Sequence, residues 1–427
     1  MRIKLLALAG ALIFAGALAT GCSDDDNGNG GTTINLGLLA PLSGTLEGIG
    51  LSMKNAAEMA ADEINKNGGL FASGDQIKII ALDDGTDATV SSEAAKKLVD
   101  PPNEVVALVG PATSGSAAAV QADMAKLSPK VVLVSGSATA ASLSNAGDNF
   151  FRTVASDAYQ GQVAAQYAAS LGKQNATILH IDNTYGKELA EAFKTAFEAK
   201  NGTVLAMVSY PEQTDYKNYD FTSEANQVFN PTGGTPDLVF LVTYNADGAK
   251  FTKFAAAVMP TTPPLLLGCD GNKSPDFISQ ADATVIANME GTAPLADAKD
   301  PNLKAFRDRY KQVYSVDPKV FSETIYDATY LLAYALEKAG KAERTSFSVA
   351  TMTAVSGTGA SSETAVGVNK WKDGKAALDA GKDIDYKGAA GDINWDSNGD
   401  VGKDTVYYEV WRVKGTSTET VKTLSPE

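Results

Sequence analysis

Histidine and cysteine are almost absent from this chain. Its 427 residues include one histidine, His180, and two cysteines, Cys22 and Cys269. A single imidazole excludes metal sites built from several histidines and leaves Ser-His-Asp catalysis only one candidate base. His180 lies inside the apolar segment 177–181, so we interpret it as a packed strand residue. Neither a metal ion nor a cofactor is expected.

Basic residues are also in short supply. Lys and Arg number 36 against 51 Asp and Glu, which gives a formal net charge of −15. Nucleic-acid binding depends on basic side chains that neutralise phosphates, so this balance argues against a nucleic-acid partner. We interpret the acidic excess as a solvated surface that favours solubility.

Motifs of catalysis and nucleotide binding are missing as well. The sequence contains neither G-x-S-x-G nor G-x-x-x-x-G-K-[ST]. The acidic segment 396–400 is similar to a calcium loop, but Val401 stands where that loop needs glycine, so a hairpin turn is expected. We therefore predict that the protein is not an enzyme. An amide hydrolase is the catalytic alternative, and it lacks a base.

Only the N-terminus holds a long apolar run. Arg2 and Lys4 precede the apolar residues 5–18, a pattern typical of a signal peptide over 1–21 and too short to span a bilayer comfortably. Leu18-Ala19-Thr20-Gly21-Cys22 resembles the lipobox of bacterial lipoproteins, which implies that Cys22 carries lipid and anchors the protein to a membrane. Polar residues then predict a flexible tether over 22–33. The alternative is a plain secretory signal with an incidental cysteine. With Cys22 lipidated, Cys269 has no partner for an internal disulfide.

From residue 34 onward, apolar β-branched runs alternate with amphipathic segments. This alternation predicts an α/β fold of parallel sheets with helices on both faces, and the rhythm restarts near 150–156. Residues 356–387 show little periodicity and predict surface loop with a short helix. Strands are expected at 34–39, 76–82, 105–109, 131–134, 177–181, 203–210, 238–242, 265–268 and 406–413, and helices at 52–66, 90–99, 114–127, 158–171, 186–200, 302–314 and 322–339.

Two loops of small hydroxylated residues follow strands of the first series. They are Gly110-Pro111-Ala112-Thr113-Ser114-Gly115-Ser116 and Ser135-Gly136-Ser137-Ala138-Thr139. Short side chains expose backbone N–H groups, and the hydroxyls add donors, so these loops suit a small anion such as a carboxylate. In the second series, Tyr185, Tyr244 and Asp270 stand at or just beyond strand ends. Ligands of parallel sheets bind at those ends, so the two sets together predict a site for a zwitterion.

The order and spacing of several motifs identify a family resemblance. The motifs are Gly37-Leu38-Leu39-Ala40-Pro41-Leu42-Ser43-Gly44, Asn65-Lys66-Asn67-Gly68-Gly69, Phe151-Arg152-Thr153 and Gly391-Asp392-Ile393-Asn394-Trp395-Asp396 with Asn398-Gly399-Asp400. From 34 to about 413 the chain resembles type I periplasmic binding proteins of the branched-chain amino-acid receptor family. The resemblance implies two doubly wound parallel-sheet lobes joined by a multi-strand hinge. It places 34–153 with 293–390 in the N-terminal lobe, and 154–292 with 391–427 in the C-terminal lobe.

The resemblance also assigns ligand-binding roles. Ser114, Ser137 and Thr139, with Ala138 in the same loop, are expected to bind the ligand carboxylate. Tyr185 and Tyr244 match tyrosines that close over the ligand, and Asp270 matches an acidic residue that receives the ammonium. Ile49 and Phe321 fall where the ligand side chain is expected.

Each of these residues has a simpler structural alternative. Ser114 could cap a helix, Thr139 could be a turn residue, the tyrosines could lie at a rim, and Asp270 could cap a turn.

These expectations converge on a solute-binding protein of an ABC importer. It would be a monomer, facing the periplasm and anchored to a bacterial membrane by lipid alone, that presents an amino acid, branched-chain or otherwise apolar, to an ABC permease. A sensory receptor for the same ligands, or a binding protein for another small carboxylate or amide, is the alternative.

Overall fold

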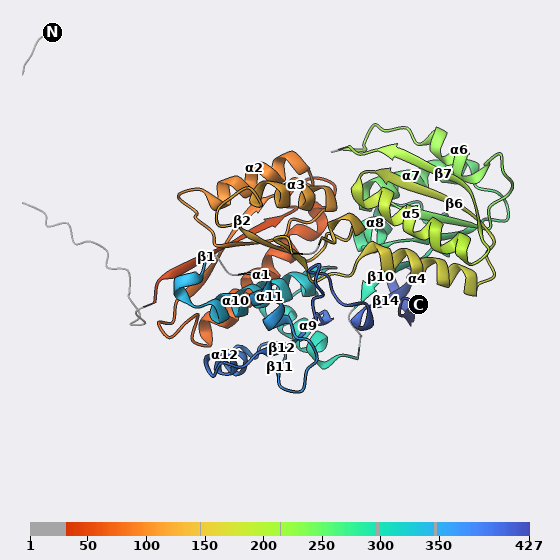
Figure 1. Cartoon of the computed structure of the whole chain (residues 1–427). Helices are drawn as coiled ribbons and strands as arrows, with labels where there is room; N and C mark the ends of the chain where they lie inside the picture. Colours follow the sequence, from red (N-terminus) through yellow and green to blue (C-terminus); the bar gives the residue numbers. More distant parts are fainter. Residues whose placement is uncertain (1–30, 146, 214, 296–298, 346–347) are drawn as a thin grey trace, which may run out of the picture.

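The computed structural model describes residues 31–427 except 146, 214, 296–298 and 346–347. The predicted signal peptide 1–21 and the predicted lipidation site Cys22 lie outside the described residues, as does nearly all of the predicted tether 22–33. Figure 1 shows two lobes side by side, one with the red and orange N-terminal strands and the other with the green central ones. Among the described residues, no helix has both the length and the apolar character needed to cross a bilayer.

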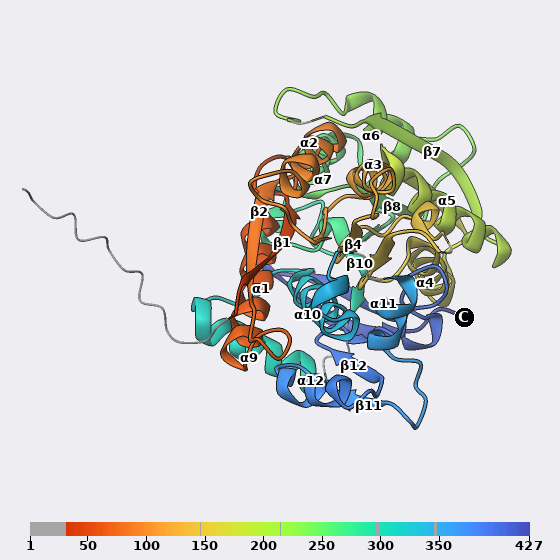
Figure 2. The same ribbon diagram turned by 60° about the vertical axis from the view of Figure 1, so that its left-hand side comes forward.

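The first lobe is built on a five-stranded parallel sheet in the order β2-β1-β3-β4-β5. Side chains of neighbouring residues on β1 enter different cores. Leu38 packs in the core that contains α1 (Glu47–Lys66) and α10 (Ser322–Ala339), whereas Leu39 packs in the core of α2 (Ala88–Val99) and α3 (Ser114–Met124). Helices therefore cover both faces, as predicted, and α1 and α10 run next to each other in Figure 2. The strands are β1 (Thr33–Ala40), β2 (Gln76–Asp83), β3 (Ala107–Val109), β4 (Val132–Ser135) and β5 (Phe150–Arg152).

The second lobe is built on a seven-stranded sheet in the order β15-β14-β10-β9-β8-β6-β7. The strands from β10 to β7 are parallel, and β14 and β15 add an antiparallel edge. Strands β10 and β15 were not expected from sequence. In β10, Gly291 and Pro294 interrupt the pattern that is typical of a strand. The strands are β6 (Asn175–Asp182), β7 (Thr203–Pro211), β8 (Leu238–Val242), β9 (Leu265–Gly268), β10 (Glu290–Leu295), β14 (Tyr407–Lys414) and β15 (Ser417–Leu424), and the helices are α4 (Asp157–Ser170), α5 (Thr184–Ala199), α6 (Thr222–Phe229), α7 (Asn245–Val258) and α8 (Pro275–Gln280).

A small third sheet corrects the expectation of surface loop over 356–387. It joins β11 (Thr364–Val366), β12 (Ile384–Gly388) and β13 (Gly391–Asp392) in that order. Trp371 and Tyr386 of this region are fully buried, and Trp371 stacks on Tyr334 of α10 at 4.7 Å between ring centroids. Gly, Ser and Lys dominate the local composition, so these few buried aromatic residues did not produce a recognisable strand or helix pattern. The remaining helices are α9 (Pro301–Tyr314), α11 (Val349–Ser356) and α12 (Trp371–Asp379).

The chain passes between the lobes at three places, after β5, after β10 and before β14. Arg152 lies at the first of these and is fully buried. Its guanidinium donates to Asp400 Oδ1 at 2.7 Å, to the carbonyl of Ala140 at 2.9 Å and to Ser144 Oγ at 2.8 Å. Because Asp400 precedes β14, this ion pair ties the first crossing to the third.

Replacing Asp400 by alanine should destabilise the fold strongly. The Arg152 guanidinium would stay buried without its carboxylate, a change that typically costs about 3–5 kcal/mol of unfolding free energy. Urea unfolding of the purified variant measures this loss. Asp404→Ala removes an exposed carboxylate from the same segment and should stay within about 0.5 kcal/mol of the parent protein. Equal stabilities of the two variants would contradict the assigned role of the pair.

Candidate functional site

A cavity lies where the strand ends of the two sheets face each other. Its volume is ≈ 30 Å³. The predicted ligand residues that line it are at most 9% exposed, so the cavity is shielded from solvent. It brings together every predicted ligand residue except Ala138 and Thr139. The lining residues are Leu46, Ile49, Ala112, Thr113, Ser114, Ser137, Tyr185, Tyr244, Asp270, Gly271 and Phe321.

The wall from the first lobe carries hydroxyls and the start of a helix. Thr113 is the N-cap of α3 and accepts the Ser116 N–H at 3.3 Å, so the capping role considered for Ser114 belongs to Thr113. Ser114 Oγ accepts the Ala140 N–H at 3.1 Å, which leaves its own proton free to be donated. The N-terminus of a helix carries partial positive charge, so this wall suits an anion.

The second loop contributes less directly than predicted. Ser137 lines the cavity and donates through Oγ to the carbonyl of Ala112 at 2.9 Å. Ala138 is fully buried, with its N–H on Ser135 Oγ at 3.0 Å. Thr139 Oγ1 donates to Asp157 Oδ2 at 2.9 Å, so its hydroxyl positions a carboxylate and does not line the cavity.

The opposite wall carries two tyrosines and an acid. Tyr185, in the first turn of α5, and Tyr244, the N-cap of α7, stack with ring centroids 5.4 Å apart and planes 8° from parallel. The Tyr185 hydroxyl donates to Asp270 Oδ1 at 2.9 Å. Asp270 follows β9 and is 6% exposed. The ideal Cβ of a side chain at Gly271 would meet the carbonyl of Thr243 at 2.3 Å, so the backbone beside Asp270 needs glycine.

Two residues that the sequence analysis did not assign lie beside Asp270. Gln160 Nε2 donates to Asp270 Oδ1 at 2.8 Å, and Asp157 is close enough for the charge of Asp270 to raise its pKa. Both lie at the start of α4, three residues apart on one helical face. The sequence signal that could have identified Asp157 and Gln160 is their position at the start of a helix, soon after a strand. Among the described residues, Asp157 Oδ1 and Gln160 Oε1 have no hydrogen-bond partner.

Electrostatics favour a cation beside these acids. Burial raises the pKa of the Asp270 carboxyl, and its hydrogen bonds from Gln160 and Tyr185 oppose the rise only in part. Burial and then the charge of Asp270 raise the pKa of Asp157, while Thr139 and Arg152 lower it. A ligand ammonium next to Asp270 would offset the unfavourable burial of carboxylate charge. With the hydroxyl wall opposite, the cavity suits a zwitterion.

Apolar residues complete the cavity on one side. Leu46 and Ile49 come from the beginning of α1, and Phe321 precedes α10. Ile49 is 2% exposed and Phe321 9%. Ile49 and Phe321 lie where the sequence placed the ligand side chain, so this part of the cavity suits an apolar group.

Residues 33–407 match the family model described as periplasmic binding protein. The chain belongs to this family. Its members bind solutes without converting them, so the protein is a solute-binding protein and not an enzyme.

Individual relatives resemble the chain over most of its length. The Leu/Ile/Val-binding protein BraC3 of Rhizobium johnstonii is 29% identical over 317 residues, which cover 73% of this chain and 80% of the relative. The branched-chain amino acid transporter substrate binding protein of Streptococcus pneumoniae, solved with isoleucine, has a TM-score of 0.71 at 23% identity and covers 92% of this chain and 100% of that one. A solute binding protein of R. palustris, solved with benzoate, has a TM-score of 0.70 at 18% identity, with coverages of 92% and 97%. These two likenesses show the two-lobed fold.

The buried acids should make the stability of the unliganded protein depend on pH. The folded-state pKa values of Asp157 and Asp270 are raised, so the folded chain holds more protons than the unfolded one. The contribution of these two groups to stability is therefore fully present at acid pH and is lost as pH rises above the ordinary aspartate range. Asp270→Asn removes one such group while its Oδ1 can still accept from Gln160 and Tyr185. Its unfolding free energy relative to the parent protein should rise as the pH increases above the ordinary aspartate range in urea titrations. A pH-independent difference would contradict this sign.

Proposed function

We propose that the protein binds an amino acid with a branched-chain or other apolar side chain in this cavity and presents it to the permease of an ABC importer. The observation that carries the proposal is one solvent-shielded cavity with a hydroxyl wall, an acid opposite and apolar residues between. The isoleucine bound to the Streptococcus pneumoniae protein supports the same ligand class.

Each part of the ligand has a proposed partner. Ser114 holds the carboxylate with the backbone at the start of α3, and Ser137, whose hydroxyl proton is donated to the carbonyl of Ala112, lies beside it. Asp270 receives the ammonium, and Asp157, positioned by Thr139 beside Ala138, lies near it. Tyr185 and Tyr244 close over the ligand, and Ile49 and Phe321 contact its side chain. Buried charge-assisted hydrogen bonds of this kind contribute about 1.5–3 kcal/mol each.

Movement of the lobes would couple binding to transport. We assign 34–153 with 293–390 to one lobe and 154–292 with 391–427 to the other, joined by the three crossings, and the ligand closes them by hinge motion. The protein acts as a monomer facing the periplasm. The permease reads the closed form, which brings surfaces of both lobes together.

An aromatic carboxylate is the second candidate, supported by the benzoate in the R. palustris protein. Such a ligand satisfies the hydroxyl wall but leaves the buried Asp270 without a cation. We therefore favour the amino acid.

Loss of the Asp270 carboxylate should weaken amino-acid binding selectively. Asp270→Ala leaves the ligand ammonium buried and unpaired, so calorimetric affinity for leucine should fall by about 2 kcal/mol or more, roughly thirtyfold. Asp182→Ala is the matched control, because this exposed carboxylate ends strand β6 of the same sheet. Leucine at a hundred times its dissociation constant should stabilise the parent protein by about 2.7 kcal/mol.

The competing ligand class is tested with the same proteins. 4-Methylpentanoate, which is leucine without its ammonium, should bind the parent protein far more weakly than leucine does and should lose little on Asp270→Ala. Stabilisation by benzoate but by no amino acid would overturn the amino-acid proposal.

We also propose that Cys22 carries the lipid anchor. Cys22→Ser should abolish incorporation of a labelled fatty acid and move the protein from the membrane to the soluble fraction of cells. Cys269→Ser is the control, because that thiol is fully buried and should leave labelling unchanged. A Cys22→Ser protein that is still labelled would show that the lipid lies elsewhere.

A further inference from the structure

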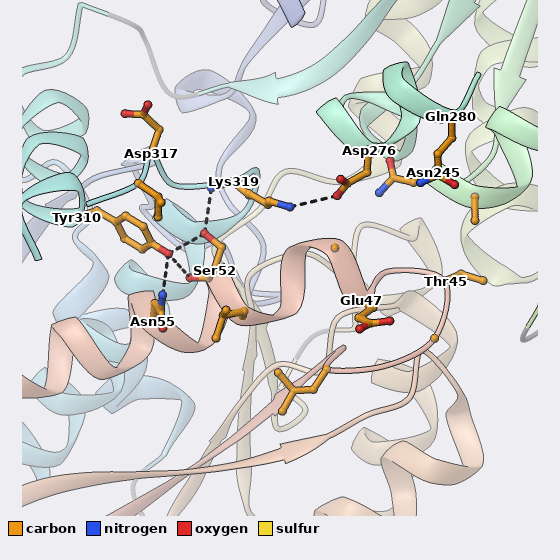
Figure 3. A pocket seen from close by; sticks show the side chains of 16 residues that line it. Thr45, Glu47, Ser52, Asn55, Asn245, Asp276, Gln280, Tyr310, Asp317 and Lys319 are labelled. Carbon is orange, nitrogen blue, oxygen red and sulfur yellow. Dashed lines mark hydrogen bonds and ion pairs between the residues drawn. The ribbon is translucent and has the colours of Figure 1, made fainter. Parts of the chain in front are cut away.

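A second, larger cavity lies on the other side of the first turn of α1. This groove has a volume of ≈ 800 Å³ and walls from both lobes. Leu46 and Ile49 of α1 and the loop before it face the ligand cavity, whereas Glu47, Gly48 and Leu51 line the groove. Asp276 of α8 lines the opposite side, and Figure 3 shows the side chain of Lys319 reaching toward it. The beginning of α1 is therefore a partition between the ligand cavity and the groove.

Asp276 and Lys319 form an ion pair between the lobes. Lys319 Nζ lies 3.1 Å from Asp276 Oδ2. The backbone of Lys319 is fixed to the first lobe, because its amide N–H donates to Ser52 Oγ at 3.0 Å. The Ser52 hydroxyl also hydrogen-bonds to Tyr310 and Ser322. Asp276 is fixed to the second lobe, since the α8 N-cap, Ser274, donates to Asn245 Oδ1 of α7 at 2.6 Å. The pair can therefore form only when the lobes approach each other.

Gly48 leaves room for this contact. An ideal Cβ at Gly48 would lie 2.4 Å from Asp276 Oδ2, so a side chain there would make the end of the Asp276 side chain shift away from its present position. Gly48 is the second residue of α1 and needs no left-handed backbone, so nothing in the helix itself calls for glycine. Alanine is the better helix former at such a position. The glycine is explained by the neighbouring lobe.

We infer that Gly48, Asp276 and Lys319 form a latch that holds the two lobes closed and so sets ligand affinity without touching the ligand. The inference rests on the proposed function, in which the ligand is bound between closed lobes. A ligand that needs the closed form binds with an apparent dissociation constant equal to the intrinsic one divided by the closed fraction. Residues that change only that fraction therefore change affinity.

Both parts of the latch act through the same ion pair. Lys319 and Asp276 are 39% and 41% exposed, and exposed ion pairs are weak, so Lys319→Met should raise the dissociation constant only about two- to fivefold. Gly48→Ala would displace Asp276 Oδ2 from Lys319, so this change should raise the dissociation constant by a similar factor, with faster ligand release. Because alanine favours the helix, the same change should leave the unliganded protein as stable as the parent or more so. A residue with a merely structural role would lose stability and affinity together.

The closing experiment measures affinity, release rate and unliganded stability for Gly48→Ala, Asp276→Ala and the double variant. Removing the carboxylate removes the obstacle, so Gly48→Ala should cost far less affinity in the Asp276→Ala background than alone. Lys311→Met is the control for Lys319→Met, because Lys311 pairs with Asp317 inside the first lobe and should leave affinity unchanged. Additive losses in the double variant, or lower stability of Gly48→Ala, would overturn the latch.

A measurement without ligand separates this inference from the proposed function. Nitroxide labels at Glu93 on α2 and Lys253 on α7, both exposed, report the separation of the lobes by pulsed electron resonance in the Cys22→Ser protein. Gly48→Ala should shift the distance distribution toward the open form. If the parent protein bound no amino acid, the proposed function would fail, and an unchanged distribution would still refute the latch.

Discussion

The site depends on one constraint, the burial of the Asp270 carboxylate between two lobes. Taking a carboxylate out of water is costly unless a cation or several donors meet it. Gln160 and Tyr185 supply two donors, both to Oδ1, and burial still raises the pKa of the group. The free-energy cost of burying this carboxylate is largest when the lobes are closed and no cation is present. A ligand ammonium removes it, so closure and ligand binding favour each other.

The fold explains how such a site can be assembled from distant residues. In each lobe, the carboxyl ends of parallel strands point to one edge of the sheet, and the connections into the following helices gather there. Ser114 and Ser137 follow β3 and β4, while Tyr185, Tyr244 and Asp270 follow β6, β8 and β9. Each lobe alone presents a shallow polar edge. Opposed across the cavity, the edges bring a donor-rich wall and an acidic one to the same cavity.

The sequence predicted what depends on local order and missed what depends on contact between segments. Strands such as 238–242 were identified because a β-branched run is a local signal, and Ser114, Tyr244 and Asp270 followed from their places at strand ends. Thr139 was expected to line the cavity, but it binds Asp157 instead, a partner 18 residues away. The third sheet was missed because its stability comes from Trp371 and Tyr386 packing on α10, which composition does not reveal.

Selectivity and affinity are then carried by different residues. In the proposed function, the hydroxyl wall and Asp270 meet the groups that all amino acids share, so they favour the class of ligand equally for every member. In the same proposal, Ile49 and Phe321 meet the part that differs, and substitutions there would change which member is preferred. Gly48, Asp276 and Lys319 lie on the far side of α1 and touch neither part. Their effect on the closed fraction multiplies the affinity for all ligands by the same factor. A change at the latch should therefore rescale every dissociation constant and preserve the order of preference among ligands.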